Sequence, residues 1–214
     1  EKKREIGLPF LLITKKIEKK DKSERKISGI LKRLKETKKD KMFQKKIVIT
    51  GPESTGKSTL SKALAKKYGC SLVDEYARTY LSDNNKPYGL DDVLVMAKEQ
   101  LKREVAVKNQ LVILDTDLTV FAIWIKEKYH LEIDWINQQL SQSTNKIYFL
   151  CDTTIEWEED AWREHPKAED RKRLFELYKI LLEKYGLTYY IITGSVSSRV
   201  EKCQQIITDF YSEA

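Results

Sequence analysis

A glycine-rich segment, Gly51 to Thr59 (GPESTGKST), has the composition and spacing of a phosphate-binding loop. Its glycines let the backbone curl so that N–H groups point at phosphate oxygens, and the helix expected from Lys57 adds its positive dipole end. Lys57 supplies a mobile charge for the β- and γ-phosphates, and the Ser58 hydroxyl is suited to Mg²⁺. We therefore expect bound ATP to be held by Gly51, Glu53, Ser54, Thr55, Gly56, Lys57, Ser58 and Thr59.

Acidic side chains follow two hydrophobic segments, and phosphoryl transfer requires carboxylates of this kind. Asp115 ends the segment VILD, a hydrophobic strand followed by an acid, which is typical of a magnesium-binding Walker B segment. We place Asp115 nearer the metal and Asp117 further along, toward the acceptor. A strand-end aspartate that caps the next helix is a common alternative for one of the two. Glu75 is suited to orient the acceptor hydroxyl, with a helix N-terminal acid as the equally weighted alternative.

The segment from Trp157 to Arg173 is highly charged and follows the fourth expected strand, where P-loop kinases place a lid. Arg163 and Arg171 are the candidate cations for the charge that develops during phosphoryl transfer. A solvated helical face is the alternative interpretation for either arginine. Trp157 could stack on an aromatic base, although large aromatic residues more often pack in a core.

These candidates must be positioned by an alternation of strands and helices that begins at Met42. The expected strands are Lys46–Thr50, Ser71–Asp74, Leu111–Leu114, Lys146–Cys151 and Thr188–Thr193. Apolar residues at helical spacing predict helices at Lys57–Tyr68, Asp91–Lys108, Leu118–Lys128, Asp170–Tyr185 and about Ser197–Tyr211. Uniformly hydrophobic strands separated by helices indicate a parallel sheet covered on both faces. The sequence thus predicts an α/β P-loop NTPase fold, a three-layer sandwich with a five-stranded parallel sheet and a lid segment.

The 214 residues carry a formal net charge of +7 that is unevenly distributed. Residues 1–41 contain 16 Lys/Arg and 7 Asp/Glu, a net charge of +9, whereas residues 42–214 have a net charge of −2. We therefore expect a basic leader at 1–41, with one short helix from Ser23 to about Lys38, and a phosphotransferase domain at 42–214 without affinity for nucleic acid. We interpret the leader as a solvated tail, or as residues upstream of a start at Met42; a basic arm for an acidic partner or a membrane surface is the alternative.

Cysteine spacing and hydropathy indicate the compartment. No apolar run approaches the roughly 18 residues that a membrane-spanning helix needs, so we expect no membrane association of the core. Cys70, Cys151 and Cys203 have no metal-ligand or CxxC spacing, which favours ordinary thiols in a reducing cytoplasm. The oligomeric state is not indicated by the sequence.

Several motifs, taken in order, resemble the ribosylnicotinamide kinase domain of NadR-type proteins. The resemblance extends over essentially residues 43–210 and is carried by the phosphate loop through Leu60, Glu75–Tyr80 (EYARTY), Leu114–Thr119 (LDTDLT), Glu156–Arg163 (EWEEDAWR) and Ile192–Ser195 (ITGS). The last of these resembles the loop that holds adenine in such kinases, which adds Gly194 and Ser195 to the expected nucleotide site.

The resemblance implies that ATP and Mg²⁺ are used to convert nicotinamide riboside to nicotinamide mononucleotide. The 5′-hydroxyl of the riboside would attack the γ-phosphate, oriented by Glu75 or Asp117. Trp157 or a tyrosine of the EYARTY segment would face the nicotinamide, because a cationic ring favours aromatic faces and carboxylates. The matching motifs add further acceptor-binding candidates: Tyr76, Arg78, Tyr80 and Asp160.

The sequence departs from the longer members of this family, which carry an adenylyltransferase domain with an HxGH motif, and in some cases a helix-turn-helix domain. The 41-residue leader is too short for the first and lacks a convincing helix pair for the second, so we expect a single-activity kinase. Three alternatives remain: a P-loop kinase for another nucleoside or nucleoside monophosphate, a regulatory P-loop ATPase switch, and a DNA-binding regulator that acts through the leader.

Overall fold

The computed structural model describes residues 44–84, 86–155 and 167–212. Five hydrophobic segments form strands there, at the places that the sequence predicts. They are rich in β-branched and aromatic residues, which suit a buried pleated surface. The strands are β1 (Lys45–Thr50), β2 (Ser71–Val73), β3 (Leu111–Asp115), β4 (Lys146–Cys151) and β5 (Thr188–Ile192).

These strands form one parallel sheet in the order β2-β3-β1-β4-β5. Ile47 of the central strand β1 pairs with Ile113 of β3 on one side and with Ile147 of β4 on the other. Because the paired strands run in the same direction, their carboxyl ends meet at one edge, where open parallel sheets bind ligands. The phosphate loop after β1 and the acidic residues after β2 and β3 therefore share this edge.

Helices follow each of the strands, and the first begins and ends where the sequence predicts. The short helices α3 and α6 were not predicted. The helices of the described residues are α2 (Lys57–Tyr68), α3 (Tyr76–Asn84), α4 (Leu90–Ala106), α5 (Leu118–Tyr129), α6 (Asp134–Ser141), α7 (Ala168–Lys184) and α8 (Val196–Ser212).

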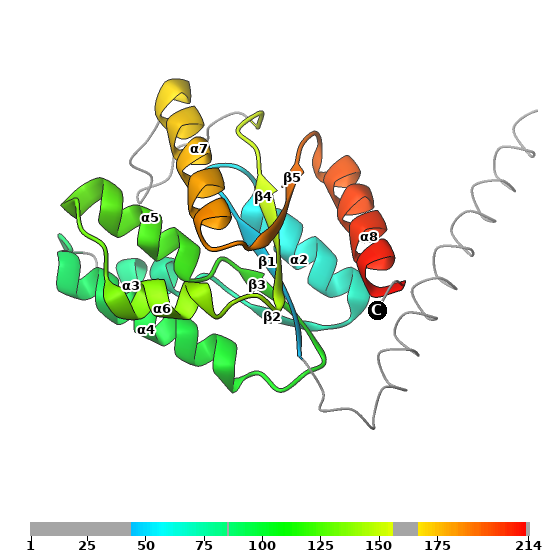
Figure 1. Cartoon of the computed structure of the whole chain (residues 1–214), viewed down its shortest axis with the longest axis horizontal. Helices are drawn as coiled ribbons and strands as arrows, with labels where there is room; N and C mark the ends of the chain where they lie inside the picture. The colour runs from blue at the N-terminus through cyan, green and yellow to red at the C-terminus, as the bar shows by residue number, and fades with distance from the viewer. Residues whose placement is uncertain (1–43, 85, 156–166, 213–214) are drawn as a thin grey trace, which may run out of the picture. The chain divides into compact units, whose positions relative to one another are not determined.

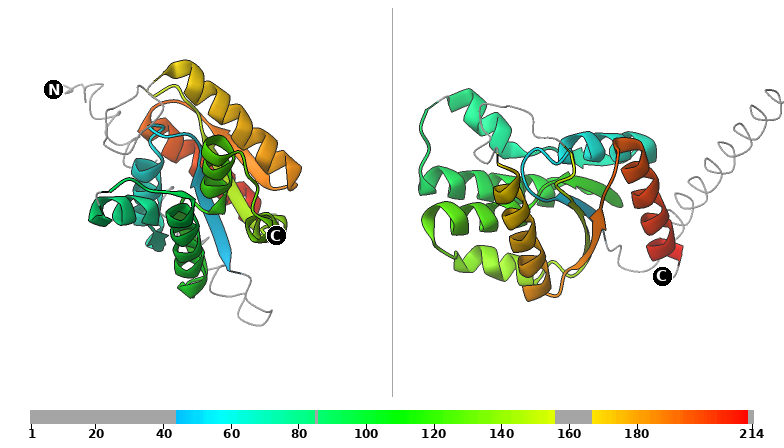
Figure 2. Two further views of the ribbon diagram at one scale, coloured as in Figure 1. Left: turned by 90° about the vertical axis from the view of Figure 1, so that its left-hand side faces the viewer. Right: turned by 90° about the horizontal axis from the view of Figure 1, so that it is seen from above.

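The sheet lies between two layers of helices (Figures 1 and 2). Val48, Leu114 and Tyr148 point to one face, where they pack in a core cluster with residues of α5 and α7. α2 packs against β1 and β3, and α2 and α8 lie on the opposite face. The predicted three-layer α/β P-loop fold with a five-stranded parallel sheet is confirmed.

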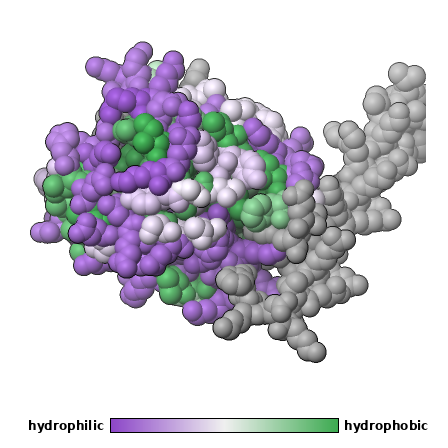
Figure 3. Space-filling model, in the orientation of Figure 1, coloured by the Kyte–Doolittle hydropathy of each residue, from purple (hydrophilic) through white to green (hydrophobic). Residues whose placement is uncertain are grey.

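The surface of the described part is mostly polar on the face shown in Figure 3, where hydrophobic residues form small separate areas. Among the described residues, no helix is long and apolar enough to span a bilayer. The helix predicted at Ser23–Lys38 lies outside the described residues, and so does most of the predicted lid. The domain boundary at Met42 stays a prediction.

Candidate active site

The phosphate loop owes its shape to glycines at positions that other residues would strain. Gly51 has a φ of 131°, and a Cβ there would lie 2.7 Å from the carbonyl oxygen of Cys151. Gly56 has a φ of 75°, and Ser54 also adopts a positive φ, of 54°. A backbone of this kind turns successive N–H groups toward one concave surface, which is the geometry of an anion-binding nest. The predicted phosphate loop is therefore present as a folded feature of the backbone.

The loop leads directly into α2, whose N-cap, Gly56, provides no side-chain hydrogen bond. The first N–H groups of a helix have no intrahelical partners, so this N-terminus is suited to an anion. Lys57 bends back over the loop and donates from Nζ to the Pro52 carbonyl at 2.7 Å. A cavity of about 370 Å³ opens here and is lined by Ser54, Thr55, Gly56, Lys57, Ser58, Thr59, Lys62, Glu75, Arg78, Ile155 and Val196. We call it the phosphate cavity.

Asp115 and Ser58 stand beside this cavity and provide the donor atoms that a magnesium ion requires. The Ser58 hydroxyl hydrogen-bonds the Asp115 carboxylate. Burial raises the pKa of Asp115, and the bond from Ser58 and the charge of Lys57 oppose that shift. The buried Oδ1 atom of Asp115 has no hydrogen-bond partner within the described part of the chain. An orphaned carboxylate oxygen next to a hydroxyl fits Mg²⁺, which typically takes one or two protein ligands and completes its shell with phosphate and water.

Glu75 follows β2 and lines both the phosphate cavity and a second cavity beside it. Its side chain is 15% exposed and accepts a hydrogen bond from Arg78 Nε at 3.3 Å. Burial raises the pKa of Glu75; Lys57 opposes this shift and Asp115 adds to it. A carboxylate with a raised pKa, close to the phosphate-loop lysine, is suited to orient a hydroxyl group or to accept its proton.

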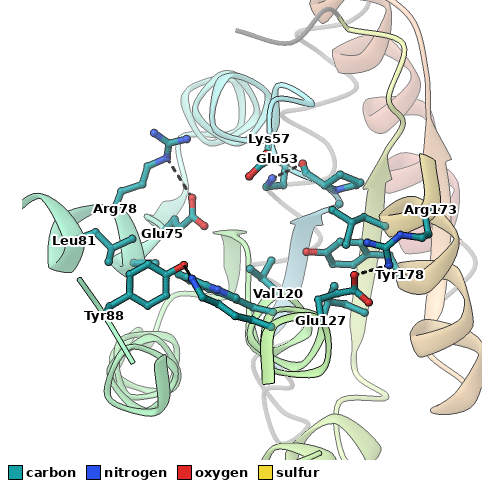
Figure 4. Close-up of a pocket in the computed structure, with 17 residues that line it drawn as sticks. Glu53, Lys57, Glu75, Arg78, Leu81, Tyr88, Val120, Glu127, Arg173 and Tyr178 are labelled. Atoms are coloured by element: carbon teal, nitrogen blue, oxygen red, sulfur yellow. Dashed lines mark hydrogen bonds and ion pairs between the residues drawn. The ribbon is translucent and has the colours of Figure 1, made fainter. Parts of the chain in front are cut away.

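The second cavity, of about 340 Å³, extends from the phosphate loop to the outer end of α5 (Figure 4). We call it the acceptor cavity. Its inner end contains Lys57 and Glu75, and its middle is apolar. Its lining is Gly51, Pro52, Glu53, Lys57, Glu75, Ala77, Arg78, Leu81, Tyr88, Val120, Ile123, Trp124, Glu127, Lys128, Arg173, Leu174 and Tyr178.

Aromatic and charged side chains form the outer end of the acceptor cavity. The rings of Tyr88 and Trp124 meet edge to face with centroids 5.2 Å apart. Lys128 Nζ donates to the Tyr88 hydroxyl at 2.7 Å, and Glu127 pairs with Arg173 at 2.5 Å. The arrangement combines aromatic faces with a carboxylate and two cations, so it is suited to a planar polar ring.

Asp117 does not have the position that the sequence predicted for it. It is 1% exposed, lines neither cavity, and caps α5 by accepting from the Thr119 N–H. Its other oxygen accepts from Lys146 Nζ and from the Tyr148 hydroxyl, each at 2.9 Å. Burial alone would raise the pKa of Asp117, but Lys146 and Thr119 outweigh it and bring the pKa below its ordinary value. The helix-capping alternative therefore describes this residue, and the acceptor-facing interpretation is wrong.

Thr116, between the two aspartates, explains why their side chains diverge. It has a φ of 72°, which is unusual for a β-branched residue, and it is completely buried. Its N–H donates to the Ile49 carbonyl at 3.0 Å, which ties the strained residue to β1. The left-handed conformation turns the chain so that Asp115 faces Ser58 while Asp117 faces the core.

The predicted tyrosines of the EYARTY segment also point away from the acceptor cavity. Tyr80 donates from its hydroxyl to Asp92 at 2.6 Å, and the Tyr76 ring lies under the guanidinium of Arg103 at 4.2 Å. Both residues therefore pack against α4, whereas Arg78 of the same segment lines both cavities. The segment is helical, so its side chains are distributed around α3 and cannot all face one cavity.

The lid residues are described only in part. Arg171 is buried, lines neither cavity, and donates to the carbonyl of Ile155 at 3.0 Å, so it holds the chain that follows β4. Trp157, Asp160 and Arg163 lie outside the described residues.

The predicted adenine loop stands beside the phosphate cavity without lining it. Gly194 has a φ of 94°, and the Ser195 hydroxyl is hydrogen-bonded to Ser197 and Ser198. Val196, the next residue, does line the phosphate cavity. The predicted adenine loop is therefore adjacent to the phosphate cavity, because the residue that follows it lines that cavity.

Sequence reasoning missed the outer wall of the acceptor cavity. Val120, Ile123, Trp124 and Glu127 recur at helical spacing along α5, and this stripe could have indicated a single functional face. Tyr88, Arg173 and Tyr178 carry no comparable signal because they reach the cavity only through the tertiary fold.

The fold and the site define a P-loop nucleotide-binding protein. A family model described as an AAA domain (AAA_28) matches residues 46–199, and the chain belongs to this family.

Among curated proteins, the chain is similar to the trifunctional NAD biosynthesis/regulator protein NadR of Escherichia coli (strain K12). The identity is 23% over 182 residues, which covers 80% of this chain and 44% of that protein. The chain thus spans less than half the length of this curated relative.

Two solved structures have the same fold. A crystal structure of NadR protein in complex with NR matches with a TM-score of 0.62 and 25% identity, covering 79% of this chain and 52% of that one. A deoxyadenosine kinase from M. mycoides matches with a TM-score of 0.55 and 18% identity, covering 77% of this chain and 99% of that one. The chain therefore has a P-loop kinase fold related to NadR and to nucleoside kinases.

Proposed function

We propose that this protein phosphorylates the 5′-hydroxyl of nicotinamide riboside with ATP and releases nicotinamide mononucleotide. One observation carries the proposal: an acceptor cavity and a phosphate cavity share Lys57, Glu75 and Arg78. A P-loop protein that only hydrolyses nucleotide needs no such second cavity of ligand size. The similarity to NadR, which has been crystallised with NR, supports the choice of acceptor.

In the proposed reaction, the phosphate loop and the N-terminus of α2 bind the triphosphate, and Lys57 follows the γ-phosphate during transfer. Magnesium, held through Ser58 and Asp115, would neutralise phosphate charge when bound. Glu75 accepts a hydrogen bond from the 5′-hydroxyl and keeps its oxygen directed at the γ-phosphate. Positioning and electrostatic stabilisation of this kind account for most of the catalysis in phosphoryl transfer.

The outer end of the acceptor cavity holds the nicotinamide ring. Tyr88 and Trp124 provide aromatic faces for it, and Glu127 provides a carboxylate at the same end. A cationic pyridinium is attracted to both kinds of group. The ring contact thus moves from the EYARTY tyrosines to Tyr88 and Trp124, while Trp157 stays a candidate. Trp157 lies outside the described residues, and Tyr76 and Tyr80 pack on α4.

A second candidate acceptor is a different nucleoside or a nucleoside monophosphate. Arg78 and Arg173 line the acceptor cavity from α3 and α7, and a pair of arginines at such a site is suited to a phosphate group. The shared fold with a deoxyadenosine kinase is compatible with this alternative.

Initial rates of ADP release distinguish these acceptors. The purified protein is supplied with Mg-ATP and, in turn, nicotinamide riboside, adenosine, thymidine, uridine, cytidine monophosphate or no acceptor. We expect stimulation by nicotinamide riboside at least tenfold above every other acceptor. Greater stimulation by another nucleoside or by the monophosphate would identify that compound as the acceptor. Equal ADP release without any acceptor would support an ATPase switch.

A further inference from the structure

A buried arginine connects the phosphate loop to the loop that follows β5. Arg199 lies near the start of α8 and is 1% exposed, and its backbone N–H donates to Ser195 at 2.9 Å. Arginine is rarely buried to this extent unless all of its charge and donors have partners. Its side chain is therefore held by a specific set of acceptors.

Three acceptors surround the Arg199 guanidinium, and each comes from a different loop at the carboxyl edge of the sheet. Nε donates to the carbonyl of Gly194 at 2.8 Å, and Nη1 donates to the carbonyl of Thr55 at 2.6 Å. Nη2 forms an ion pair with Asp152, the residue after β4. Asp152 is itself fixed, because it accepts from the Thr154 hydroxyl at 3.0 Å and its N–H donates to Ile192 at 3.1 Å.

The bond to Thr55 determines the direction of a phosphate-loop N–H. None of the described peptide bonds is cis, and in a trans peptide the carbonyl and the following N–H point in opposite directions. Arg199 draws the Thr55 carbonyl inward, so the N–H of Gly56 is turned outward. Thr55 and Gly56 both line the phosphate cavity, which places this donor where it meets a phosphate oxygen.

The bond to Gly194 gives the same side chain a second function. Gly194 precedes Ser195 and Val196, and Val196 lines the phosphate cavity. One guanidinium thus fixes both the loop that lines the phosphate cavity and the loop after β5, which the resemblance predicts to hold adenine. Loss of this side chain would release both loops together.

We propose that Arg199 is a positioning residue for nucleotide binding, which orients the Gly56 N–H and couples the phosphate loop to the loop after β5. Asp152 neutralises the buried charge, and the carbonyls of Thr55 and Gly194 fix the orientation of the guanidinium. The inference rests on the nucleotide part of the proposed function and is independent of the acceptor.

The test is the affinity of Mg-ADP, measured by titration calorimetry on the full chain with no acceptor present. Arg199→Lys retains a charge for Asp152, but one ammonium cannot reproduce the planar set of donors to both carbonyls. We expect a dissociation constant for Mg-ADP raised about tenfold or more, with inorganic tripolyphosphate weakened to a similar degree because its binding uses the same N–H. Unchanged affinity in the folded Arg199→Lys protein would overturn the proposal.

A structural effect is separated from a positioning effect by two further measurements. Asp152→Asn leaves both carbonyl contacts possible, so we expect it to lower the melting temperature while Mg-ADP affinity changes by less than about threefold. A loss of affinity equal to that of Arg199→Lys would overturn the proposal, because it would assign both effects to general loosening. If Arg199→Lys does not fold, Asp152→Asn still tests the proposal, because a loss of Mg-ADP affinity of about tenfold or more in that folded variant would overturn it.

Steady-state kinetics then separate this inference from the acceptor assignment. Whatever the acceptor that the wild-type protein uses, Arg199→Lys is expected to raise the KM for ATP and to leave the KM for the acceptor within about twofold. A wild-type protein that binds Mg-ADP but does not phosphorylate nicotinamide riboside refutes the proposed acceptor and leaves the Arg199 test intact. A wild-type protein that does not bind Mg-ADP would overturn both.

Discussion

Substitution of Asp117 by asparagine tests whether this residue stabilises the fold or takes part in the reaction. Asparagine caps helices as well as aspartate does, so the bond to the Thr119 N–H is retained. The change removes the charge that faces Lys146 Nζ at 2.9 Å in the core, and it replaces the oxygen that also accepts from the Tyr148 hydroxyl. Lys146 keeps a second carboxylate partner, Glu104, also at 2.9 Å.

The expected loss of stability follows from the burial of this pair. Removing one partner of a buried ion pair typically costs about 3–5 kcal/mol, and the remaining partner Glu104 favours the lower end, about 3 kcal/mol. For a domain of this size, 1 kcal/mol corresponds to roughly 2–4 °C, so the melting temperature should fall by roughly 6–12 °C. The folded pKa of Asp117 is below its ordinary value, so its contribution is present above about pH 4 and is lost as the pH falls through the folded pKa.

The assay is thermal unfolding from below pH 4 up to pH 8, combined with initial rates at a temperature where both proteins are folded. Asp91→Asn is the matched control, because Asp91 lies in the first turn of α4 and is exposed. That change should cost less than about 1 kcal/mol. We expect the kcat of Asp117→Asn to stay within a few fold of the wild-type value. A protein of unchanged stability that has lost turnover would refute the reasoning and return Asp117 to the acceptor site.

Three further substitutions test the site. Lys57→Ala should lower kcat by at least about a hundredfold without loss of fold, as judged by circular dichroism, because it removes a charge that faces the transferred phosphate; retained turnover would exclude this site. Glu75→Gln should lower kcat by about a hundredfold or more and raise the melting temperature at pH 8 but not near pH 4, because ionisation of a carboxyl whose folded pKa is raised destabilises the fold only as the pH rises. An unchanged melting temperature at pH 8 would contradict the cause assigned to that pKa. Gly51→Ala should weaken Mg-ADP binding at least tenfold because its Cβ meets the Cys151 carbonyl at 2.7 Å, whereas Gly186→Ala, with no atom within 4 Å, should leave binding unchanged; equal effects would contradict the role of the loop backbone.

The sheet and the phosphate loop could be predicted from the sequence because their signals are local. Buried parallel strands are continuous hydrophobic runs, and the loop has fixed glycine spacing. α6 (Asp134–Ser141) was not predicted because eight residues with three glutamine or asparagine side chains give little periodicity. The strand order was not predicted either, because it depends on crossovers that no local pattern encodes.

The candidate site was less predictable because side-chain direction depends on the backbone. The residues at the ends of strands were identified, but the left-handed conformation of Thr116, which separates Asp115 from Asp117, gives no signal in a β-branched residue. Tyr76 and Tyr80 were assigned to the acceptor by their motif, and the helical geometry of α3 places them on the other side. Trp124 and Arg199 reach their positions through contacts between elements far apart in the chain.

The central claim, that this protein phosphorylates the 5′-hydroxyl of nicotinamide riboside, is tested most directly by identifying the product. Nicotinamide riboside and Mg-ATP are incubated with the wild-type protein and, in parallel, with Lys57→Ala, and the products are followed by ³¹P NMR and mass spectrometry. We predict a phosphate monoester on the 5′ carbon of the riboside, formed in equal amount with ADP and absent with Lys57→Ala. Formation of ADP and inorganic phosphate alone, with the riboside unchanged, would contradict the account.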